Sequence, residues 1–186
     1  MIDTTPPALT LHPLPDGWVN RAEIDLTATD NLQGVLGLGP IEIDVNAASD
    51  GGDAGEWIRR STVVGTVGRR TIPVDLRGLA EGRHAVRVRV RNGGAAGARL
   101  WAEARGVVRA DLTSPVIANA GFAGGGAAPL VATWVADDAA SGVATATVQV
   151  RQGTGWRTLA REAARDGAGR MQVDGSSLSL GENTLR

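Results

Sequence analysis

Apolar and polar residues alternate with a period of two along several short segments of the chain. The clearest runs are Ala22–Ala28, Ile41–Val45, Ile72–Leu76 and Ala85–Arg91, and Ala144–Val150 shows the same pattern later. Such alternation is typical of β-strands that bury one face and expose the other. Clusters of turn-forming residues separate the runs, at Pro15–Gly17, Asp30–Gly34, Ala80–Gly82 and Asn92–Gly94. The pattern therefore predicts an all-β chain.

The same landmarks occur twice along the sequence. The segment Asp3–Pro7 returns as Asp111–Pro115 at an offset of 108 residues. Later matches, such as Trp57 with Trp156, have an offset of 99. Extra loop residues in the first repeat account for the difference, because insertions in loops are readily tolerated. The sequence therefore contains an internal duplication.

The duplication predicts two domains, residues 1–110 and 111–186. Roughly seven short strands per repeat, joined by glycine-rich turns, are typical of an immunoglobulin-like β-sandwich. Because Arg186 matches Arg87, we expect the second repeat to lack about 23 residues at its end. The predicted fold class is all-β, with two tandem immunoglobulin-like β-sandwiches, the second truncated at its C-terminal strands. A missing strand leaves an open sheet edge, so we expect the second repeat to be the less stable.

Two local features complete this picture of the fold. The segment Thr158–Arg165 has good helix propensity, but its counterpart Arg59–Thr66 is rich in β-branched residues, so we predict strand and loop for both. Pro7 and Pro115 occupy equivalent places in the two repeats. Proline fixes φ and removes a hydrogen-bond donor, which suits a stiff entry into an edge strand.

Several short phrases resemble those of bacterial immunoglobulin-like domains from secreted and cell-surface proteins. They are Asp3–Pro7, Gly17–Asn20, Leu26–Asp30, Trp57 and Gly82–Arg87, in the order in which those domains use them. The Gly-Trp-x-Asn phrase is most similar to repeats of the OmpL47 type. Where these families commonly show Asp-x-x-Gly-Asn, the chain instead has Asn92–Gly97. The resemblance implies a non-catalytic protein at the cell surface or outside the cell.

Composition excludes several kinds of chemistry. The chain has no Cys, which rules out disulfides, Cys zinc sites and thiol nucleophiles, and it has only His12 and His84. All 19 cationic residues are Arg, against 20 acidic residues. This balance gives no global field to attract nucleic acid. No apolar run approaches the roughly 20 residues that cross a membrane. Because the serines lack a neighbouring His, we predict no catalytic residues and no enzyme activity.

Arg87, Arg89 and Arg91 lie on one face of a predicted strand, opposite a row of valines. Guanidinium groups in such a stripe suit acidic glycans or phosphates. The alternative is a solvated face on which Glu42 and Asp44 of a neighbouring strand form ion pairs with the arginines. The sequence leaves both interpretations open.

The five tryptophans fall into three groups. Trp57 and Trp156 occupy equivalent positions, which favours a structural role, although an exposed ring there would suit a sugar. Trp134 stands opposite Leu26 in the repeat alignment, which predicts burial. Trp18 and Trp101 have no counterpart and are the candidates for exposed, ligand-binding rings.

Carboxylates near the second strand of each repeat raise the question of a metal site. Asp30 and Asp138 lie in equivalent loops, and Asp111 lies where the repeats join. Asx side chains in such loops ordinarily accept backbone hydrogen bonds within a turn. The alternative is a Ca²⁺ site formed by Asp30, Asp138 and Asp111, although Ca²⁺ takes six to eight oxygen ligands. Asp50 and Asp53 form a second, weaker Ca²⁺ candidate. We therefore predict no cofactor, with Ca²⁺ as the alternative.

These observations together predict a non-catalytic structural, spacer and adhesion segment of a bacterial secreted or cell-surface protein. Its expected partners are glycans, other surface proteins and the remainder of the parent chain. We expect no nucleic-acid binding and no membrane insertion within this segment. The alternative function is an accessory carbohydrate-binding module attached to an extracellular hydrolase.

Overall fold

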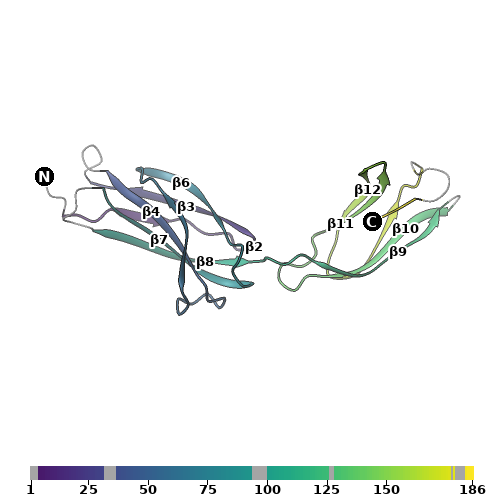
Figure 1. Cartoon of the computed structure of the whole chain (residues 1–186), viewed down its shortest axis with the longest axis horizontal. Coiled ribbons are helices and arrows are strands. Elements are labelled where there is room, and N and C mark those ends of the chain that lie inside the picture. The colour runs from purple at the N-terminus through teal and green to yellow at the C-terminus, as the bar shows by residue number, and fades with distance from the viewer. Residues whose placement is uncertain (1–3, 32–36, 94–99, 126–127, 177, 179–182) are drawn as a thin grey trace. The chain divides into compact units, whose positions relative to one another are not determined.

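The computed structural model describes residues 4–31, 37–93, 100–125, 128–176, 178 and 183–186. Every regular element in these ranges is a β-strand, which confirms the all-β prediction. Within the same ranges, no helix is long and apolar enough to cross a membrane. The chain divides into two compact units, Met1–Leu112 (unit 1) and Thr113–Arg186 (unit 2) (Figure 1).

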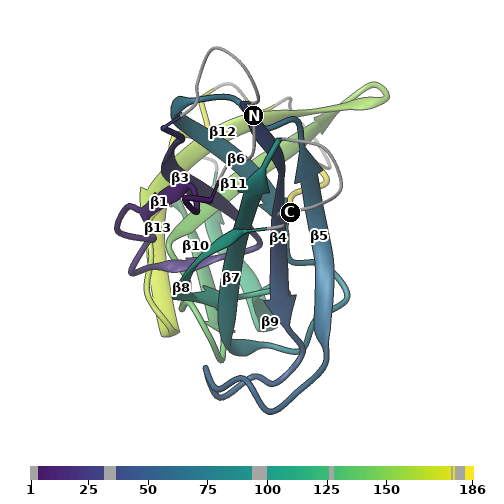
Figure 2. The ribbon, with the colours of Figure 1, turned by 90° about the vertical axis from the view of Figure 1, so that its left-hand side faces the viewer.

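In the residues that the structure describes, unit 1 is a β-sandwich of eight strands. They are β1 (Ala8–Leu11), β2 (Trp18–Val19), β3 (Arg21–Thr29), β4 (Leu38–Asn46), β5 (Trp57–Val63), β6 (Gly68–Asp75), β7 (Gly82–Asn92) and β8 (Trp101–Ala110). One sheet has the order β1-β3-β6 and the other β2-β8-β7-β4-β5. Figure 2 shows β5, β4, β7 and β8 side by side. The short β2 pairs in parallel with the end of β8, and the other pairs are antiparallel.

The core of unit 1 is built from alternate residues of the long strands. Ile24 and Leu26 of β3, Ile43 of β4, and Val86 and Val88 of β7 are fully buried. Their chain neighbours point outward, as the period of a strand requires. Removing these branched side chains from water is the main force that holds the two sheets together. The alternation read from the sequence therefore identifies the core face correctly.

The described part of unit 2 has five strands and a short pairing segment. The strands are β9 (Val116–Gly125), β10 (Ala128–Asp137), β11 (Thr145–Gln152), β12 (Gly155–Ala163) and β13 (Gly167–Val173). They form a β13-β10-β9 sheet and a β11-β12 pair. Leu185 forms a bridge with Val150 on β11. The strand predicted for Thr158–Ala163 is confirmed, because this segment belongs to β12.

The strand registers of the two units follow the offsets of the sequence repeat. In unit 1, Ile24 of β3 pairs with Ile72 of β6. In unit 2, Ala132 of β10 pairs with Met171 of β13. Each residue of the second pair is reached from the first by one of the two sequence offsets, 108 and 99. The sequence repeat and the strand pairing therefore agree residue by residue.

The two units differ in the size of their cores. Sixteen buried apolar residues form the core cluster of unit 1, whereas five form that of unit 2, counting the residues that the structure describes. Because apolar burial dominates stability, we expect the amides of β10 and β13 to exchange faster than those of β3 and β7. Hydrogen exchange followed by mass spectrometry measures this difference. Equal protection of the two sets of strands would contradict it.

Candidate functional site

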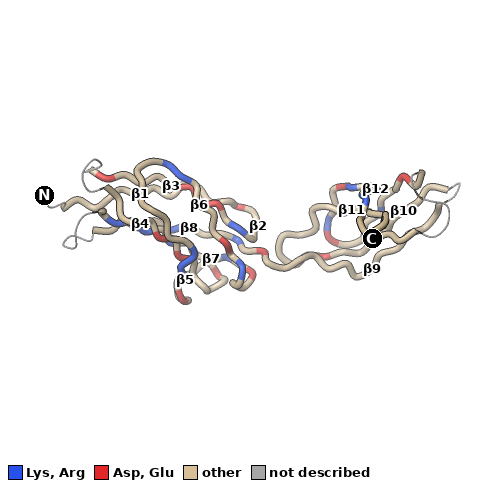
Figure 3. Tube along the Cα trace, turned by 45° about the horizontal axis from the view of Figure 1, so that its top comes forward, with Lys and Arg blue, Asp and Glu red and all other residues tan. Residues whose placement is uncertain are grey.

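The outer face of the five-stranded sheet of unit 1 gathers most of the candidate ligand-binding residues. We call it the Arg–Trp face, because arginines and tryptophans dominate it. Residues paired across strands point to the same side of a sheet, so the pairings place the following side chains on this face: Trp18, Glu42, Asp44, Trp57, Arg59, Arg83, Ala85, Arg87, Arg89, Arg91, Trp101, Glu103, Arg105, Val107 and Arg109. Figure 3 marks the positively and negatively charged residues along these strands.

Asp44 lies at the centre of the Arg–Trp face and is only 2% exposed. Its carboxylate forms ion pairs with Arg59, with Arg87 at 3.0 Å and with Arg89 at 3.2 Å. Burial by itself would raise the pKa of Asp44, but the hydrogen bonds from Arg59 and Arg87 outweigh it and lower the pKa below its usual value. The carboxylate therefore stays ionised and joins strands β4, β5 and β7.

Cation–π contacts with tryptophan rings extend the ion-pair network of Asp44 across the sheet. The guanidinium carbon of Arg87 lies 4.3 Å from the centroid of the Trp57 ring, and that of Arg105 lies 5.6 Å from it. Arg89 lies 5.5 Å from the Trp101 ring. These cation–π contacts hold the arginine stems flat against the sheet. The result is a preordered surface of alternating rings and charges.

The sequence left open whether Arg87, Arg89 and Arg91 bind a ligand or form ion pairs with Glu42 and Asp44. The structure shows ion pairs for two of the three. Arg87 and Arg89 are ion-paired with Asp44, and Arg89 also pairs with Glu42 at 3.2 Å. The predicted ion pairing with these carboxylates is therefore confirmed. Arg91 pairs with Trp101 across β7 and β8, and no ion pair of Arg91 occurs among the described residues.

The predicted exposure of Trp18 and Trp101 is confirmed, at 36% and 41%. They do not share one site, however. Trp101 begins β8, whereas Trp18 pairs with Arg109 near the end of β8. Eight residues of strand separate the two places, or about 26 Å at roughly 3.3 Å per residue. Trp101 and Arg91 therefore lie at one end of the face and Trp18 at the other.

The end next to Trp18 contains two arginines that the sequence analysis did not single out. Arg83 of β7 lies directly opposite Arg109 of β8. Both side chains are exposed, and neither forms an ion pair with a described residue. The signal for Arg83 is present in the sequence, because it has the same phase of alternation as Arg87 and Arg91.

A loop between β4 and β5 borders this end, and buried polar groups hold it in place. Asn46 Oδ1 accepts hydrogen bonds from the backbone N–H groups of Ala48 and Gly55, and its Nδ2 donates to the Gly55 carbonyl. The imidazole of His84 is fully buried. Its Nδ1 and Nε2 atoms lie 2.9 and 2.8 Å from the carbonyl oxygens of Asn46 and Ala80. Asn46 and His84 are thus positioning residues, and no pattern in the sequence points to either role.

The remaining tryptophans are half-buried. Trp57 and Trp156 hold equivalent places on β5 and β12, and Arg186 lies 4.0 Å from the Trp156 ring. Trp134 packs against the core cluster of unit 2, where its ring lies over Gly169. The prediction of burial for Trp134 is therefore met only in part, because Gly169 offers no side chain to cover the ring.

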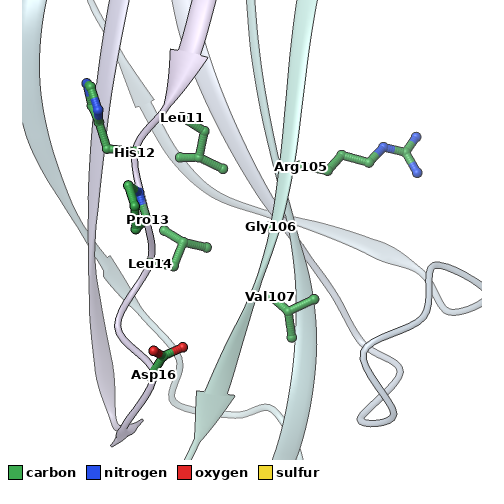
Figure 4. A pocket seen from close by; sticks show the side chains of 8 residues that line it. All are labelled: Leu11, His12, Pro13, Leu14, Asp16, Arg105, Gly106 and Val107. Atoms are coloured by element: carbon green, nitrogen blue, oxygen red, sulfur yellow. The ribbon is translucent and has the colours of Figure 1, made fainter.

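A hollow with a volume of about 430 Å³ lies beside β8 (Figure 4). The chain crosses from β1 to β2 here, and Leu11 and Leu14 point toward the strand that carries Gly106. His12, which also lines the hollow, is hydrogen-bonded to Thr27 at 2.9 Å. The lining offers no group of converging polar side chains, so we assign this hollow to packing rather than to binding.

Replacing Gly106 by valine tests that packing role. A Cβ atom at this position would lie 2.5 Å from Leu14 Cδ1 and 3.2 Å from Leu11 Cδ2. We expect the added side chain to displace Leu14 and to lower the free energy of unfolding by about 2 kcal/mol. Urea unfolding followed by tryptophan fluorescence measures the change. Gly17→Val is the control, because a Cβ there meets nothing within 4 Å. Equal midpoints for the two variants would contradict the assignment.

The residues proposed for Ca²⁺ do not form a cluster. Asp30 follows the end of β3, whereas the Asp111 N–H donates to Val19 just before β3 begins. Nine residues of strand, about 30 Å, therefore separate these two carboxylates. Asp138 Oδ1 accepts backbone hydrogen bonds from Ala140, Ser141 and Gly142, as a turn-capping side chain does. Among the described residues, no group of three or more His, Cys, Asp or Glu side chains could hold a metal ion.

Asp50 and Asp53, the weaker Ca²⁺ candidate, form contacts with protein groups. Asp50 Oδ1 accepts a hydrogen bond from the Gly52 N–H at 2.7 Å, which is an Asx turn. Asp53 forms an ion pair with Arg105 at 2.7 Å. Both carboxylates thus shape the loop beside the Arg–Trp face. Ca²⁺ binding stays a prediction from the sequence.

Two further carboxylates of unit 1 share the electrostatic character of Asp44. Side-chain hydrogen bonds from Arg69 lower the pKa of Asp25. Hydrogen bonds from the side chain and backbone of Arg77 lower the pKa of Asp75 to about 2. An unfolded Asp titrates near pH 3.9, by contrast. All three groups therefore release their protons more readily in the folded state.

These pKa values predict acid sensitivity of unit 1. A carboxylate with a lower pKa in the folded state stabilises the fold above its unfolded pKa, and that stabilisation disappears as the pH falls through the folded pKa. We expect the urea midpoint of unit 1 to fall between about pH 4 and pH 2. Asp44→Asn is the control, with a smaller fall over the same range because the most buried carboxylate is absent. The same fall in both proteins would contradict the role of Asp44.

Comparison with known proteins gives few similarities. No family model matches the chain, and no curated protein matches it. One similar solved structure is a tetra-tandem repeat in the extending region of a large adhesion protein, with 21% identity and a TM-score of 0.37 over 96% of this chain. The chain spans 43% of the length of that protein. Another is from a chaperone–tip adhesin complex of CFA/I fimbriae biogenesis, with 6% identity, a TM-score of 0.35, and coverage of 96% of this chain and 97% of that one.

TM-scores below 0.5 do not establish a shared function. The resemblance to OmpL47-type repeats stays a prediction, since no family model matches. The alternative of an accessory module attached to a hydrolase finds no support in these comparisons.

Proposed function

We propose that the chain is a spacer and adhesion segment of a bacterial secreted or cell-surface protein. Its units are two tandem immunoglobulin-like sandwiches. The Arg–Trp face of unit 1 is the contact surface. The partners of this face are glycans or other surface proteins.

The observation that carries the proposal is the ordered state of the Arg–Trp face. Ion pairs and cation–π contacts fix the arginines and Trp57 before any partner arrives. Trp18 and Trp101 remain partly exposed at the two ends. Binding surfaces benefit from such preordering because less side-chain entropy is lost on association. Tryptophan and arginine are also the residues that most often dominate binding energies at interfaces.

The electrostatics of the face favour binding over catalysis. A general acid or base works best with a pKa near the working pH, which for a carboxylate means a raised value. The pKa of Asp44 is lowered instead, because its hydrogen bonds to Arg59 and Arg87 outweigh the effect of burial. Its negative charge holds three arginines in place, which supports a structural role for Asp44.

The entry to each unit supports the role of spacer. Pro7 directly precedes β1, and Pro115 directly precedes β9. Both strands lie at an edge of their sheet, as predicted from the sequence. The fixed φ of proline restricts the chain at these points. Stiff entries of this kind suit a segment that holds a binding surface away from its anchor.

A binding assay with the labelled 186-residue chain tests the proposal. Glycan arrays and immobilised cells are probed with the wild type and with a Trp18→Ala, Trp101→Ala variant. We expect the variant to lose binding. The control variant is Arg21→Gln, Thr71→Ala, which changes the outer face of the other sheet. The proposal fails if the wild type binds nothing, or if both variants bind as well as the wild type.

A further inference from the structure

We propose that the end of the Arg–Trp face next to Trp18 binds acidic sugars, with the sugar carboxylate held by Arg83 and Arg109. This inference rests on the proposed function of the face as a contact surface. It assigns the ligand to residues outside the stripe that the sequence suggested.

Strands β7 and β8 contain two pairs of arginines in which one member lies opposite the other. The two pairs differ in whether carboxylates neutralise them. Arg87 lies opposite Arg105, and Arg83 lies opposite Arg109. Like charges placed directly opposite one another on neighbouring strands are unfavourable. Asp44 neutralises Arg87, and Asp53 and Glu103 neutralise Arg105.

The second pair forms no such ion pairs among the described residues: Asp50, which forms a β-bridge with Arg83, instead caps the turn at Gly52. No described carboxylate lies within ion-pair distance of Arg83 or Arg109. An anion at this place relieves the repulsion of the two guanidinium groups. Guanidinium groups bind carboxylates through two parallel hydrogen bonds, which are stronger than neutral ones. The pair therefore selects for a ligand that carries a carboxylate.

A hollow of about 450 Å³ lies between the two arginine pairs. Ala85 and Val107, which are paired across the strands, form its apolar floor. The loop residues Gly51–Asp53 form one wall, and Gly51 lies close to the stem of Arg83. Arg83 and Arg109 each lie two residues from the floor along their strand, about 7 Å away. A ligand with its carboxylate on these arginines therefore places its body over the hollow.

The other end of the hollow favours hydroxyl groups. Asp53 is exposed and pairs with Arg105, so its carboxylate oxygens and the guanidinium group can exchange hydrogen bonds with a polyol. A second carboxylate is unfavourable there because Asp53 and Glu103 are themselves negative. One acid group at one end, an apolar face and hydroxyls at the other end describe a uronic acid residue.

Trp18 and the location of the site favour a sugar over an acidic peptide. The indole of Trp18 stands beside Arg109 and is partly exposed, so it offers an aromatic surface to the C–H face of a neighbouring sugar ring. A peptide that adds to a sheet needs a free strand edge for its main-chain hydrogen bonds. The hollow instead lies over the face of β7 and β8, whose backbone groups are already paired.

Calorimetry on the 186-residue chain at low salt tests the inference. The probes are a tetrasaccharide of galacturonic acid, its methyl ester and the neutral galactose tetrasaccharide. We expect only the free acid to bind well, and we expect its affinity to fall at least about tenfold in both Arg83→Gln and Arg109→Gln, which is the scale of a lost charged hydrogen bond. The control is Arg161→Gln, an equal charge change on β12 of unit 2.

The stability of the variants distinguishes a binding role of Arg83 and Arg109 from a structural one. Removing one member of a like-charge pair relieves repulsion, so the urea midpoints of Arg83→Gln and Arg109→Gln should equal or exceed that of the wild type. A lowered midpoint would overturn the inference, because these arginines would then serve the fold.

The remaining outcomes are also decisive. Equal binding of the neutral sugar, the methyl ester or a poly-glutamate peptide overturns the assignment to acidic sugars. If the wild type adheres to surfaces through Trp101 but ignores the acidic tetrasaccharide, the proposed function stands and this inference fails. If the wild type binds nothing, both fail together.

Discussion

Replacing Asp44 by alanine lowers the free energy of unfolding of unit 1 by about 3 kcal/mol, the amount typical of breaking a buried ion pair. The reason is that one carboxylate serves three arginines, Arg59, Arg87 and Arg89. Without it, three neighbouring cations of the Arg–Trp face repel one another. Glu42 compensates only in part, because it reaches Arg59 and Arg89 but not Arg87. Urea unfolding followed by tryptophan fluorescence measures the loss.

Asp25→Ala is the matched control for Asp44→Ala. Asp25 also pairs with an arginine across neighbouring strands, at 2.5 Å from Arg69, but on the outer face of the other sheet. The Arg69 side chain is largely exposed, so solvent screens this pair and we expect its loss to cost much less than the loss of Asp44. Similar losses for the two variants would show that burial of Asp44 adds nothing, and would overturn the account of the Arg–Trp face.

The alternation of residues predicts which side of a strand is buried, and here it succeeds where the contrast between positions is strong. In β7, valines alternate with arginines, so the inward Val86 and Val88 and the outward Arg87 and Arg89 are all evident in the sequence. The fold class follows from the same signal. The physical reason is that burial of branched apolar side chains dictates the register of a half-buried strand.

The binding end of the face could not be predicted in the same way. The inward positions of β8 include the small residues Ala102, Ala104 and Gly106, whose low apolar contrast hides the alternation. The pairing of Arg83 with Arg109 depends on which strands become neighbours and in which register. Tertiary packing decides which strands become neighbours and in which register. The alternation along a single strand contains no information on either.

The loop Gly51–Asp53, beside the hollow over Ala85 and Val107, shows a second limit of prediction from the sequence. In the sequence, Asp50 and Asp53 in a glycine-rich segment suggest metal ligands, since carboxylates in loops often are. In the folded chain, Asp50 caps a turn and Asp53 pairs with Arg105 from β8, 52 residues away. Partners at such a distance along the chain give no local signal. The fold was therefore more predictable than the uses of its charged side chains.

Replacing His84 by alanine should be the most disruptive single change in unit 1. The imidazole is fully buried and connects the end of β4, through the Asn46 carbonyl, with the turn before β7, through the Ala80 carbonyl. Its removal leaves a cavity and takes the imidazole N–H donor from a buried backbone carbonyl. We expect the free energy of unfolding to fall by about 4 kcal/mol, which combines the cost of a cavity with that of unpaired polar groups.

The other histidine of the chain provides the control. His12 bonds to Thr27 through one ring nitrogen and lies partly exposed, so His12→Ala should cost about 1 kcal/mol. His84→Gln retains a smaller polar side chain and should lie between the two alanine variants, which keeps the comparison informative if His84→Ala does not fold. Hydrogen exchange of residues 47–56 adds a second measurement, because loss of the Asn46 contact frees the loop that walls the hollow. Unchanged exchange there in His84→Gln would mean that Asn46 holds the loop by its own side chain, and that His84 stabilises the core alone.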